Sequence, residues 1–298
     1  MTRPTTAVYA CGAGYGHLTR TRAVLHTLGI PAETAVVLAR PAPDPALADG
    51  LRVVPVPEVD DAWSAAGRAE LGAGVRRVLE DLGTAHLIVD AFPAGIRGEL
   101  DADAVPDGVV VDHVARLVRW DVYAPFLPRR PVRLATVWRT EPLHPPHDRY
   151  LVGQTDAVHD LTLVDPPRSP VGDPVPQGDG RPRWLIVHAG PPDEVRHLAD
   201  YAVDEARAEG LAPPDIDLVV VTPHADVVGL PAAARLVAHV PAVDLYPTAD
   251  RIVTGGGFNA VRQTEAWSDR HLVVPFERRF DDQFARARRV RARHRRSG

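Results

Sequence analysis

Lysine is absent from this chain of 298 residues, and all 34 of its basic residues are arginines. This absence excludes Schiff-base chemistry and a phosphate-binding loop that ends in a lysine. The single cysteine, Cys11, excludes an internal disulfide and a metal site built from several cysteines. No apolar run approaches the ~20 residues of a membrane span, and the N-terminus lacks the apolar core of a signal peptide. We therefore expect a cytoplasmic protein.

An excess of positive charge is also missing, because the net charge is −5, and we expect no nucleic-acid partner. The basic residues are nevertheless unevenly distributed, since residues 286–296 hold seven arginines and no acidic residue. A solvated helix end is the simplest interpretation of this segment. The alternative is an electrostatic contact with phosphate or with an anionic membrane surface, as in a peripheral membrane protein.

Short apolar strands alternate with helices along both halves of the chain, which indicates parallel sheets covered on both faces. In the first half we expect strands at residues 7–10, 34–38, 51–56, 86–89 and 108–111, with helices at 18–28 and 65–82. Ser64 is the expected N-cap of the second of these helices. In the second half we expect strands at residues 183–187, 218–222, 251–254 and 272–275, with helices at 192–210, 232–238 and 259–267.

A proline-dense segment separates the two halves. Residues 166–183 contain six prolines and three glycines without periodicity, which is typical of a linker or an exposed loop. The chain is long enough for two domains of ordinary size. We predict two α/β domains, with an N-terminal domain at residues 1–168 and a C-terminal domain at residues 169–298.

A glycine-rich turn follows the first expected strand. Gly12, Gly14 and Gly16 permit a tight turn and the close approach of a ligand. His17 then opens a helix, whose dipole disfavours a charged imidazole, so that His17 can accept a proton near neutral pH. A dinucleotide-binding fingerprint is a competing interpretation, but its third glycine would fall at His17 and the acid expected on the second strand is missing. A purely structural turn is the other alternative.

His17 needs an orienting carboxylate to act as a general base. Asp90 and Asp112 each follow an apolar run, and sites in open α/β sheets form at the carboxyl ends of strands. Either residue fits this role, and either fits the alternative of capping the turn or helix that follows.

A second glycine-rich turn, Gly255, Gly256 and Gly257, precedes Phe258 and Asn259. Three consecutive glycines are costly in chain entropy, so that a bound ligand or close packing is expected there. Backbone N–H groups in such a turn can approach an anion closely.

Two further segments of the second half carry candidate polar groups. Asp282 and Gln283 offer a carboxylate and an amide, which hydrogen-bond sugar hydroxyls well, although Asp282 also fits a helix N-cap. Gly190, after His188 at the end of an expected strand, is in a position that suits a phosphate contact, but the two prolines that follow lack backbone donors.

Residues 245–283 resemble the donor-binding half of family 28-like GT-B glycosyltransferases, especially the branch that contains the lipid-linked GlcNAc transferase of peptidoglycan synthesis. The resemblance is carried by Leu245-Tyr246-Pro247-Thr248-Ala249-Asp250, Gly255-Gly256-Gly257-Phe258-Asn259-Ala260-Val261, Leu272-Val273-Val274-Pro275 and Asp282-Gln283. The first turn, residues 14–20, resembles the acceptor-side G-x-G-H-x-x-R turn of the same families. Residues 90–95 with 98–100 resemble a motif of uncharacterised bacterial relatives.

The resemblance implies the α/β GT-B architecture, in which two Rossmann-like domains face each other across a cleft. It implies that the turn from Gly255 to Asn259 holds the donor diphosphate and that Asp282 and Gln283 contact the donor sugar. It places the ribose-binding glutamate of the family at Gln263, a departure that puts nucleotide binding in question, with Glu265 two residues further on. His17 matches the position that deprotonates an acceptor hydroxyl or water, on the acceptor-side turn that also contains Arg20.

These observations together predict an inverting, metal-independent glycosyltransferase without a cofactor. Its expected partners are a UDP- or dTDP-linked sugar donor and a small-molecule or lipid-linked acceptor. One alternative is a nucleotide-sugar hydrolase of the same fold in which His17 activates water. The other is a catalytically silent nucleotide-sugar-binding protein, which the glutamine at position 263 would suit.

Overall fold

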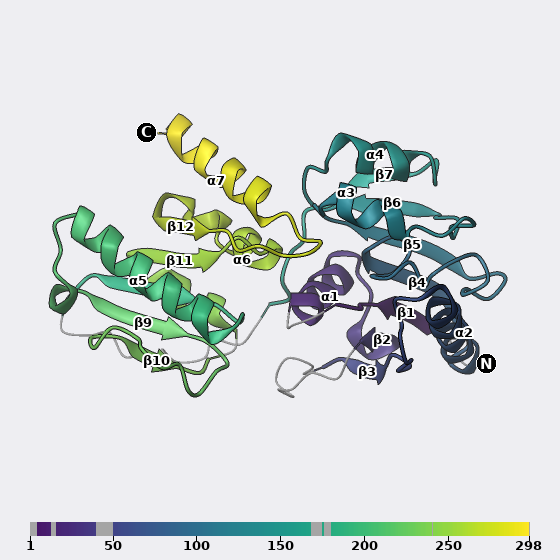
Figure 1. Ribbon diagram of the computed structural model, residues 1–298, viewed down its shortest axis with the longest axis horizontal. Helices are drawn as coiled ribbons and strands as arrows, with labels where there is room; N and C mark the ends of the chain where they lie inside the picture. The colour runs from purple at the N-terminus through teal and green to yellow at the C-terminus, as the bar shows by residue number, and fades with distance from the viewer. Residues whose placement is uncertain are drawn as a thin grey trace. The chain divides into compact units, whose positions relative to one another are not determined.

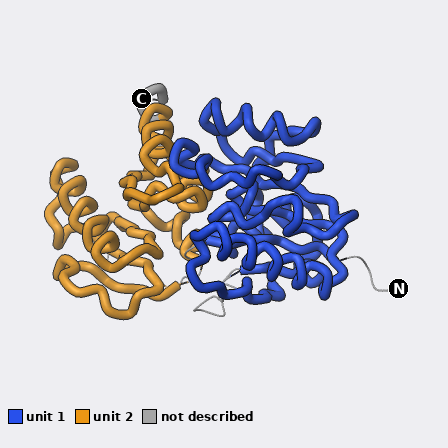
Figure 2. Tube along the Cα trace, turned by 45° about the vertical axis from the view of Figure 1, so that its right-hand side comes forward, with its two compact units in different colours: residues 1–167 blue, residues 168–298 orange. Residues whose placement is uncertain are grey.

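The computed structural model describes residues 5–12, 16–39, 50–167, 175, 180–239 and 241–297. The chain divides into two compact units, Met1–Pro167 (unit 1) and Arg168–Gly298 (unit 2), drawn in separate colours in Figure 2. This division falls one residue from the predicted boundary. Most of the proline-dense segment that we interpret as a linker, residues 168–174 and 176–179, lies outside the described residues.

Unit 1 is built on one parallel sheet (Figure 1), in the strand order β3-β2-β1-β4-β5-β6-β7. Its strands are β1 (Thr5–Tyr9), β2 (Ala35–Ala39), β3 (Arg52–Pro55), β4 (Thr84–Ala91), β5 (Val110–Ala115), β6 (Thr136–Arg139) and β7 (Val158–Asp160). Its helices are α1 (Gly16–Thr27), α2 (Ala65–Asp81), α3 (Trp120–Tyr123) and α4 (Pro145–Val152), with 3-10 turns η1 (Ala32–Thr34) and η3 (Ala124–Phe126).

The core of unit 1 forms where α2 packs on the central strands. Val75 and Leu79 of α2 lie in one buried cluster with Tyr9 of β1 and Leu87 and Val89 of β4. Val8 and Ile88 alternate with these residues along the strands and are also buried, so that both faces of the sheet are covered. The predicted N-cap of α2 is confirmed, because the Ser64 hydroxyl accepts a hydrogen bond from the N–H of Gly67.

Unit 2 is built on a smaller parallel sheet, in the strand order β10-β9-β8-β11-β12. Its strands are β8 (Arg183–Val187), β9 (Asp217–Val221), β10 (Arg235–Val237), β11 (Arg251–Gly255) and β12 (His271–Val274). Its helices are α5 (Pro192–Ala208), α6 (Phe258–Gln263) and α7 (Gln283–Ser297), with 3-10 turns η4 (Pro213–Asp215), η5 (Ala242–Thr248) and η6 (Glu265–Arg270).

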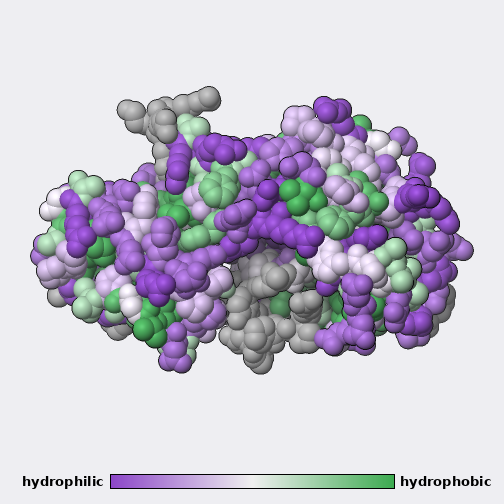
Figure 3. Space-filling model, viewed as in Figure 1, coloured by the Kyte–Doolittle hydropathy of each residue, from purple (hydrophilic) through white to green (hydrophobic). Residues whose placement is uncertain are grey.

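Helix α5 lies over the sheet of unit 2 (Figure 1) because its apolar residues recur at helical spacing. Val195, Leu198 and Ala202 are fully buried against Trp184 and Ile186 of β8. Hydrophilic and apolar residues are interspersed on the face of this unit that Figure 3 shows. Among the described residues, none of the helices is both long and apolar enough to span a membrane.

Three predictions about secondary structure are wrong. The single helix expected at residues 259–267 is divided, because α6 ends at Gln263 and the 3-10 turn η6 follows from Glu265. Residues 232–238 do not form a helix, because Arg235–Val237 pairs with β9 as the edge strand β10. The strand expected to end before Asp112 continues to Ala115, because Asp112, Val114 and Ala115 are paired with β4 on one side and Thr136, Trp138 and Arg139 lie opposite on β6. Asp112 therefore lies inside β5.

Each sheet has one point at which the strand order reverses. In unit 1 it lies between β1 and β4, and in unit 2 between β8 and β11. Open α/β sheets bind ligands beside the carboxyl ends of the strands at such a point. Both glycine-rich turns follow strands at these two positions, since Gly12 comes after β1 and Gly255 ends β11.

Candidate functional site

In unit 1, three side chains meet at the reversal point of the sheet. His17 is the second residue of α1 and Arg20 lies one turn later on the same helix, where side chains three residues apart are neighbours. Asp90 is the penultimate residue of β4. All three are buried, with relative exposures of 8%, 3% and 4% respectively.

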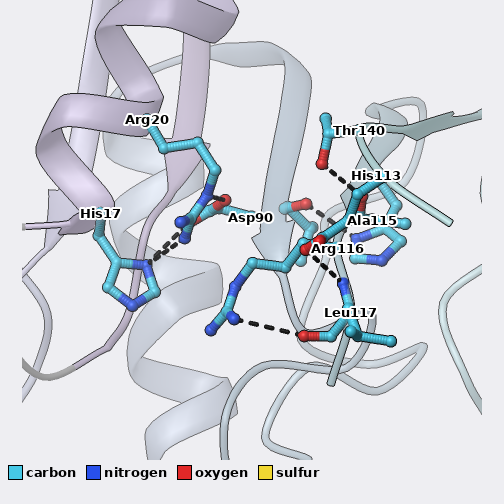
Figure 4. A network of polar contacts seen from close by, with 10 residues as sticks. His17, Arg20, Asp90, His113, Ala115, Arg116, Leu117 and Thr140 are labelled. Atoms are coloured by element: carbon cyan, nitrogen blue, oxygen red, sulfur yellow. Dashed lines mark hydrogen bonds and ion pairs between the residues drawn. The ribbon is translucent and has the colours of Figure 1, made fainter. Parts of the chain in front are cut away.

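The carboxylate of Asp90 joins the other two side chains (Figure 4). Its Oδ2 lies 2.6 Å from Nδ1 of His17. Arg20 donates to both carboxylate oxygens, from Nε to Oδ1 and from Nη2 to Oδ2, at 2.5 Å in each case. The guanidinium fork therefore binds the carboxylate through two parallel bonds, the strongest geometry that this pair can adopt.

These contacts set the protonation of His17. Burial alone would raise the pKa of Asp90, but Arg20 and His17 outweigh it and hold that pKa well below its usual value. Burial lowers the pKa of His17 and outweighs the opposing effect of Asp90. The imidazole is therefore neutral at pH 7. Nδ1 lies 2.6 Å from the Asp90 carboxylate and 3.1 Å from Nη2 of Arg20, so we assign its proton to the shorter contact with the carboxylate, which leaves a lone pair on Nε2. Within the described part of the chain, Nε2 has no hydrogen-bond partner.

Gly12 makes room for this imidazole. A Cβ atom on Gly12 would lie 1.6 Å from Nε2 of His17, a distance that no pair of unbonded atoms adopts. The glycine is thus required by the histidine ring that packs against it. Gly16 begins α1, whereas Gly14 lies outside the described residues.

The backbone after Asp90 is strained. Ala91 has a φ of 65°, in the left-handed region that L-residues rarely adopt, and the N–H of Phe92 bonds to the carbonyl of Asp90 at 2.8 Å. This tight turn ends β4 directly beyond the carboxylate. Strain of this kind costs about 1–3 kcal/mol and persists where the surrounding structure holds a functional residue in place.

Arg116 is a further member of this site that the sequence did not identify. It follows β5, is 7% exposed, and its guanidinium lies on the same side of the site as the His17 ring in Figure 4. It contributes to the lowered pKa of His17 as a nearby positive charge. Next to it, the N–H of Leu117 donates to Glu141 at 2.9 Å, which fixes this segment. The sequence offered little signal for it, because Asp112 and His113 interrupt the apolar run before Arg116.

Of the two carboxylates that could orient His17, the structure brings only Asp90 to it. Asp112 lies inside β5 and its Oδ2 is 3.0 Å from Nε2 of His86. Burial would raise the pKa of Asp112, but His86 and the neighbouring polar groups lower it. The assignment of Asp112 beside His17 is therefore corrected, because β5 extends past Asp112, which pairs with Ile88 of β4, two residues before Asp90.

In unit 2, close packing explains two of the three consecutive glycines. A Cβ on Gly255 would lie 2.9 Å from Cε1 of His188, and a Cβ on Gly256 would lie 3.1 Å from Cβ of Gln283. Gly257, in contrast, has open space at this position and a φ of −65°, which any residue can adopt. Neither packing nor backbone conformation therefore requires a glycine at position 257.

The peptide after Gly256 is held by Arg286 of α7. Arg286 is 3% exposed, and its Nη1 donates to the carbonyl of Gly256 at 2.8 Å. In a trans peptide the carbonyl and the following N–H point in opposite directions, so the N–H of Gly257 is turned away from Arg286. That N–H has no partner among the described residues, whereas the N–H of Gly256 bonds to Val274 at 3.1 Å.

The other residues predicted to bind the donor have structural contacts of their own. Oδ1 of Asp282 accepts from the N–H of Ala285, which makes Asp282 the cap of α7, and Oε1 of Gln283 accepts from the N–H of Phe276. Phe258 is 6% exposed. Asn259 and Gln263 lie on α6 and are partly buried. Glu265 lies beyond α6 and pairs with Arg293 at 3.2 Å.

Gly190 lies beside a second histidine and carboxylate pair. A Cβ there would be 2.3 Å from Nε2 of His188 and 2.7 Å from Oε2 of Glu194. Gly190 is therefore required by the contact between these two side chains. Among the described residues, no group of three or more His, Cys, Asp and Glu side chains is arranged to hold a metal ion.

No family model matches this chain, and no curated protein matches its sequence. Solved structures match it over almost its whole length. The glycosyltransferase SnogD from Streptomyces nogalater is 17% identical with a TM-score of 0.58, over 97% of this chain and 84% of that one. The glycosyltransferase SsfS6 of Streptomyces sp. SF2575, complexed with thymidine diphosphate, is 15% identical with a TM-score of 0.59, over 97% and 86%. The UDP-GlcNAc 2-epimerase from Neisseria meningitidis, bound to UDP-GlcNAc, is 11% identical with a TM-score of 0.56, over 92% and 84%.

These similarities show that the chain has the GT-B fold, as the sequence predicted. The identities are low, and glycosyltransferases and an epimerase appear among the same matches. The fold is thus shared by glycosyltransferases and by a UDP-GlcNAc 2-epimerase, and activity has to be argued from the site.

Proposed function

We propose that the protein is an inverting glycosyltransferase that moves a sugar from a UDP- or dTDP-linked donor to a hydroxyl group of a small-molecule or lipid-linked acceptor. The observation that carries this proposal is the His17–Asp90 pair, with Nδ1 and Oδ2 2.6 Å apart and Nε2 left without a partner in the described chain. A histidine held in this tautomer is suited to accept a proton from a hydroxyl group.

In the proposed reaction the acceptor hydroxyl binds at Nε2 of His17 in unit 1. His17 takes its proton as the oxygen attacks the anomeric carbon, and Asp90 stabilises the imidazolium that forms. Arg20 keeps Asp90 ionised throughout, because it binds both oxygens of the carboxylate. The attack comes from the face opposite the departing diphosphate and so inverts the anomeric centre. The scheme uses no metal and no cofactor.

Donor binding is proposed for unit 2, at the carboxyl ends of β8 and β11. The N–H of Gly257 supports this placement, because Arg286 holds the adjoining peptide in the orientation that leaves this donor without a protein partner. Such a group can stabilise the charge that develops on the leaving diphosphate. The ligands bound in two structural neighbours, thymidine diphosphate and UDP-GlcNAc, are the class of molecule that we assign to this site.

Sugar release and transfer can be measured directly. The purified protein is incubated with UDP- and dTDP-sugars, with and without a panel of hydroxyl acceptors, and products and anomeric configuration are determined by NMR. We expect acceptor-dependent transfer with inversion and a loss of about 10²–10⁴-fold in kcat for His17→Ala. His26→Ala is the matched control, because His26 is exposed on the same helix, and it should leave kcat unchanged.

Other outcomes identify other activities. Sugar release that is fast without any acceptor and that depends on His17 would indicate a hydrolase. Interconversion of the donor into a second nucleotide sugar would indicate an epimerase. Tight binding of a nucleotide sugar without turnover on the whole panel would indicate a binding protein. Near wild-type turnover in His17→Ala would contradict the role of His17 in all of these reactions.

A further inference from the structure

A second histidine, carboxylate and arginine group lies in unit 2, beside Gly190. Nε2 of His188 is 2.7 Å from Oε2 of Glu194. Arg278 donates to both oxygens of Glu194, from Nη1 to Oε1 at 2.6 Å and from Nη2 to Oε2 at 2.5 Å. His188 and Glu194 have side-chain exposures of 10% and 13%.

This group lies at the reversal point of the second sheet. His188 directly follows β8, and its ring carbon and Nδ1 would lie 2.9 and 3.1 Å from a Cβ on Gly255, the last residue of β11. The imidazole thus occupies the space that a side chain at position 255 would fill. The ring of Phe276, two residues after β12, packs against the imidazole with ring centroids 5.2 Å apart.

The hydrogen bond to Glu194 fixes the tautomer of His188. Burial would raise the pKa of Glu194, but the bonds from Arg278 and His188 outweigh it, so that the carboxylate stays ionised and accepts the proton of Nε2. Burial lowers the pKa of His188 itself, and Glu194 opposes this only in part. In the free protein at pH 7 the ring is neutral, and Nδ1 carries a lone pair with no partner in the described chain.

An anion beside that lone pair changes its protonation. A phosphate oxygen carries negative charge and accepts hydrogen bonds, so it repels a neutral Nδ1 and attracts a protonated one. We propose that His188 binds the diphosphate of the donor through Nδ1 and takes up a proton as the diphosphate binds, with Glu194 and Arg278 as positioning residues. This inference rests on the proposed function. When the bond between the anomeric carbon and the phosphate oxygen breaks, the electron pair stays on that oxygen, and the positive charge on His188 stabilises it.

The charged groups around His188 allow the neutral imidazole to take up one proton. Glu194 on α5 is the only carboxylate that bonds to the ring in the described chain, and Arg278 after β12 and His224 after β9 oppose protonation of the ring. Nε2 of His224 donates to the carbonyl of Gly190 at 2.7 Å. Asp193 and Asp281 act on Arg278 instead of on the imidazole.

Proton uptake is measured by isothermal titration calorimetry. UDP, dTDP and inorganic pyrophosphate are titrated into the full-length protein between pH 6 and 8.5, each in two buffers that differ in ionisation enthalpy. For the wild type we expect up to one proton taken up per nucleoside diphosphate. His188→Asn should abolish this uptake and weaken binding by about 10-fold, the size expected for one charge-assisted hydrogen bond.

Two variants separate positioning from folding. Glu194→Gln keeps an acceptor for Nε2 but removes the charge that favours an imidazolium, so we expect reduced uptake with an unchanged melting temperature. His197→Asn is the control, because His197 also packs on Phe276, at 5.8 Å between centroids, and is exposed. It should leave proton uptake and affinity unchanged.

The outcomes are distinguishable from those of the proposed function. Binding of a nucleoside diphosphate without proton uptake, or with uptake that persists in His188→Asn, overturns the role of His188 and leaves glycosyl transfer intact. Failure of every nucleoside diphosphate to bind overturns both proposals. Proton uptake on binding of pyrophosphate, which has no nucleoside, would support the assignment of the site to the diphosphate. It would also show that the uptake does not depend on the nucleotide base.

Discussion

In unit 1 the histidine bonds its carboxylate through Nδ1 and leaves Nε2 without a protein partner, whereas in unit 2 the histidine bonds through Nε2 and leaves Nδ1. The two histidines are equally buried, with side-chain exposures of 10%. The arginines differ, since Arg20 is 4% exposed and Arg278 is 33% exposed. The free Nε2 of His17 lies at the tip of its ring beside Gly12, while the free Nδ1 of His188 lies beside Gly255, in the turn to which we assign the donor diphosphate.

This difference is the basis on which we propose two roles for one set of residue types. In unit 1 the carboxylate comes from a strand and the arginine from the histidine's own helix, so the three groups are sealed inside the unit. In unit 2 the carboxylate lies on α5 and the arginine follows β12. The carboxylate and the arginine of the first group are more deeply buried than those of the second, which strengthens their electrostatic interaction.

The largest expected difference between the two units is at their carboxylates. Asp90→Asn should lower kcat by about 10³-fold, because an amide no longer holds the proton of His17 on Nδ1 or stabilises the imidazolium. Glu194→Gln should lower kcat by less than about 10-fold and act mainly through donor binding. Steady-state kinetics with saturating acceptor measure both, and the melting temperature checks folding, since Asp90→Asn weakens a buried ion pair with Arg20. Equal losses in the two variants would contradict different roles for the two groups.

The next largest effect is expected from adding a methyl group to either of the glycines that pack against the two histidines. Gly12→Ala places Cβ on Nε2 of His17 and must displace the imidazole, so that we expect a loss of about 10²-fold in kcat. Gly255→Ala places Cβ against the ring of His188 and should raise the donor KM instead, with a smaller change in kcat. Initial rates at varied donor concentration separate the two effects, and a raised donor KM in Gly12→Ala would count against the assignment.

Acid should also distinguish the two units. His113 and His147 of unit 1 are fully buried, and burial lowers their pKa values to about 4 and about 3 respectively. The unfolded chain takes up these protons near pH 6.5, so stability is complete above that pH and falls as the pH drops toward 4, by on the order of 3 kcal/mol for His113. Hydrogen exchange measured by mass spectrometry at pH 7 and pH 5 should show unit 1 losing protection first.

One substitution tests the cause of this acid sensitivity. The ring of His147 stacks on Trp120 with centroids 4.3 Å apart, and neither of its nitrogens has a hydrogen-bond partner in the described chain. His147→Phe keeps the stacking and removes the titration, so it should raise the stability of unit 1 at pH 5 more than at pH 7. His271 of unit 2 is the contrast, because both of its nitrogens bond to threonine hydroxyls, at 2.8 and 3.0 Å. An equal gain at both pH values would show that packing, and not protonation, is responsible.

The smallest effect concerns the glycine turn of unit 2. Gly257→Ala has room for its methyl group and should leave the melting temperature unchanged while weakening nucleoside diphosphate binding by about 10-fold, because the methyl group hinders close approach. Gly256→Ala crowds Gln283 and should lower the melting temperature. Thermal-shift titrations with UDP and dTDP measure both quantities in one experiment. Unchanged affinity in Gly257→Ala would place the diphosphate elsewhere.

The sequence predicted elements well where local patterns decide the structure. The strand before Gly12, the helix capped by Ser64 and the helix of α5 follow from short apolar runs, a hydroxyl cap and a helical repeat of apolar residues. It failed where the partner is distant. Residues 235–237 became a strand because β9 offers an open edge, a contact that no local pattern of residues 232–238 contains.

The candidate site was predictable only in part, for the same reason. The glycines beside His17 allowed the sequence to identify this histidine. The choice between Asp90 and Asp112 as its partner depends on strand register, which a single sequence does not set. The pair of Glu194 and Arg278 is separated by 84 residues and could not be found without the fold. The roles predicted for Gln263, Asp282 and Gln283 remain predictions.

The bond between Arg286 and the carbonyl of Gly256 makes the last helix an integral part of unit 2. A chimera that transplants this unit into another scaffold must therefore carry α7 with it, since a graft that stops before residue 283 would leave the glycine turn without the support that orients its peptide. Any exchange of this unit should accordingly be planned around this helix as well as around the strands that it follows.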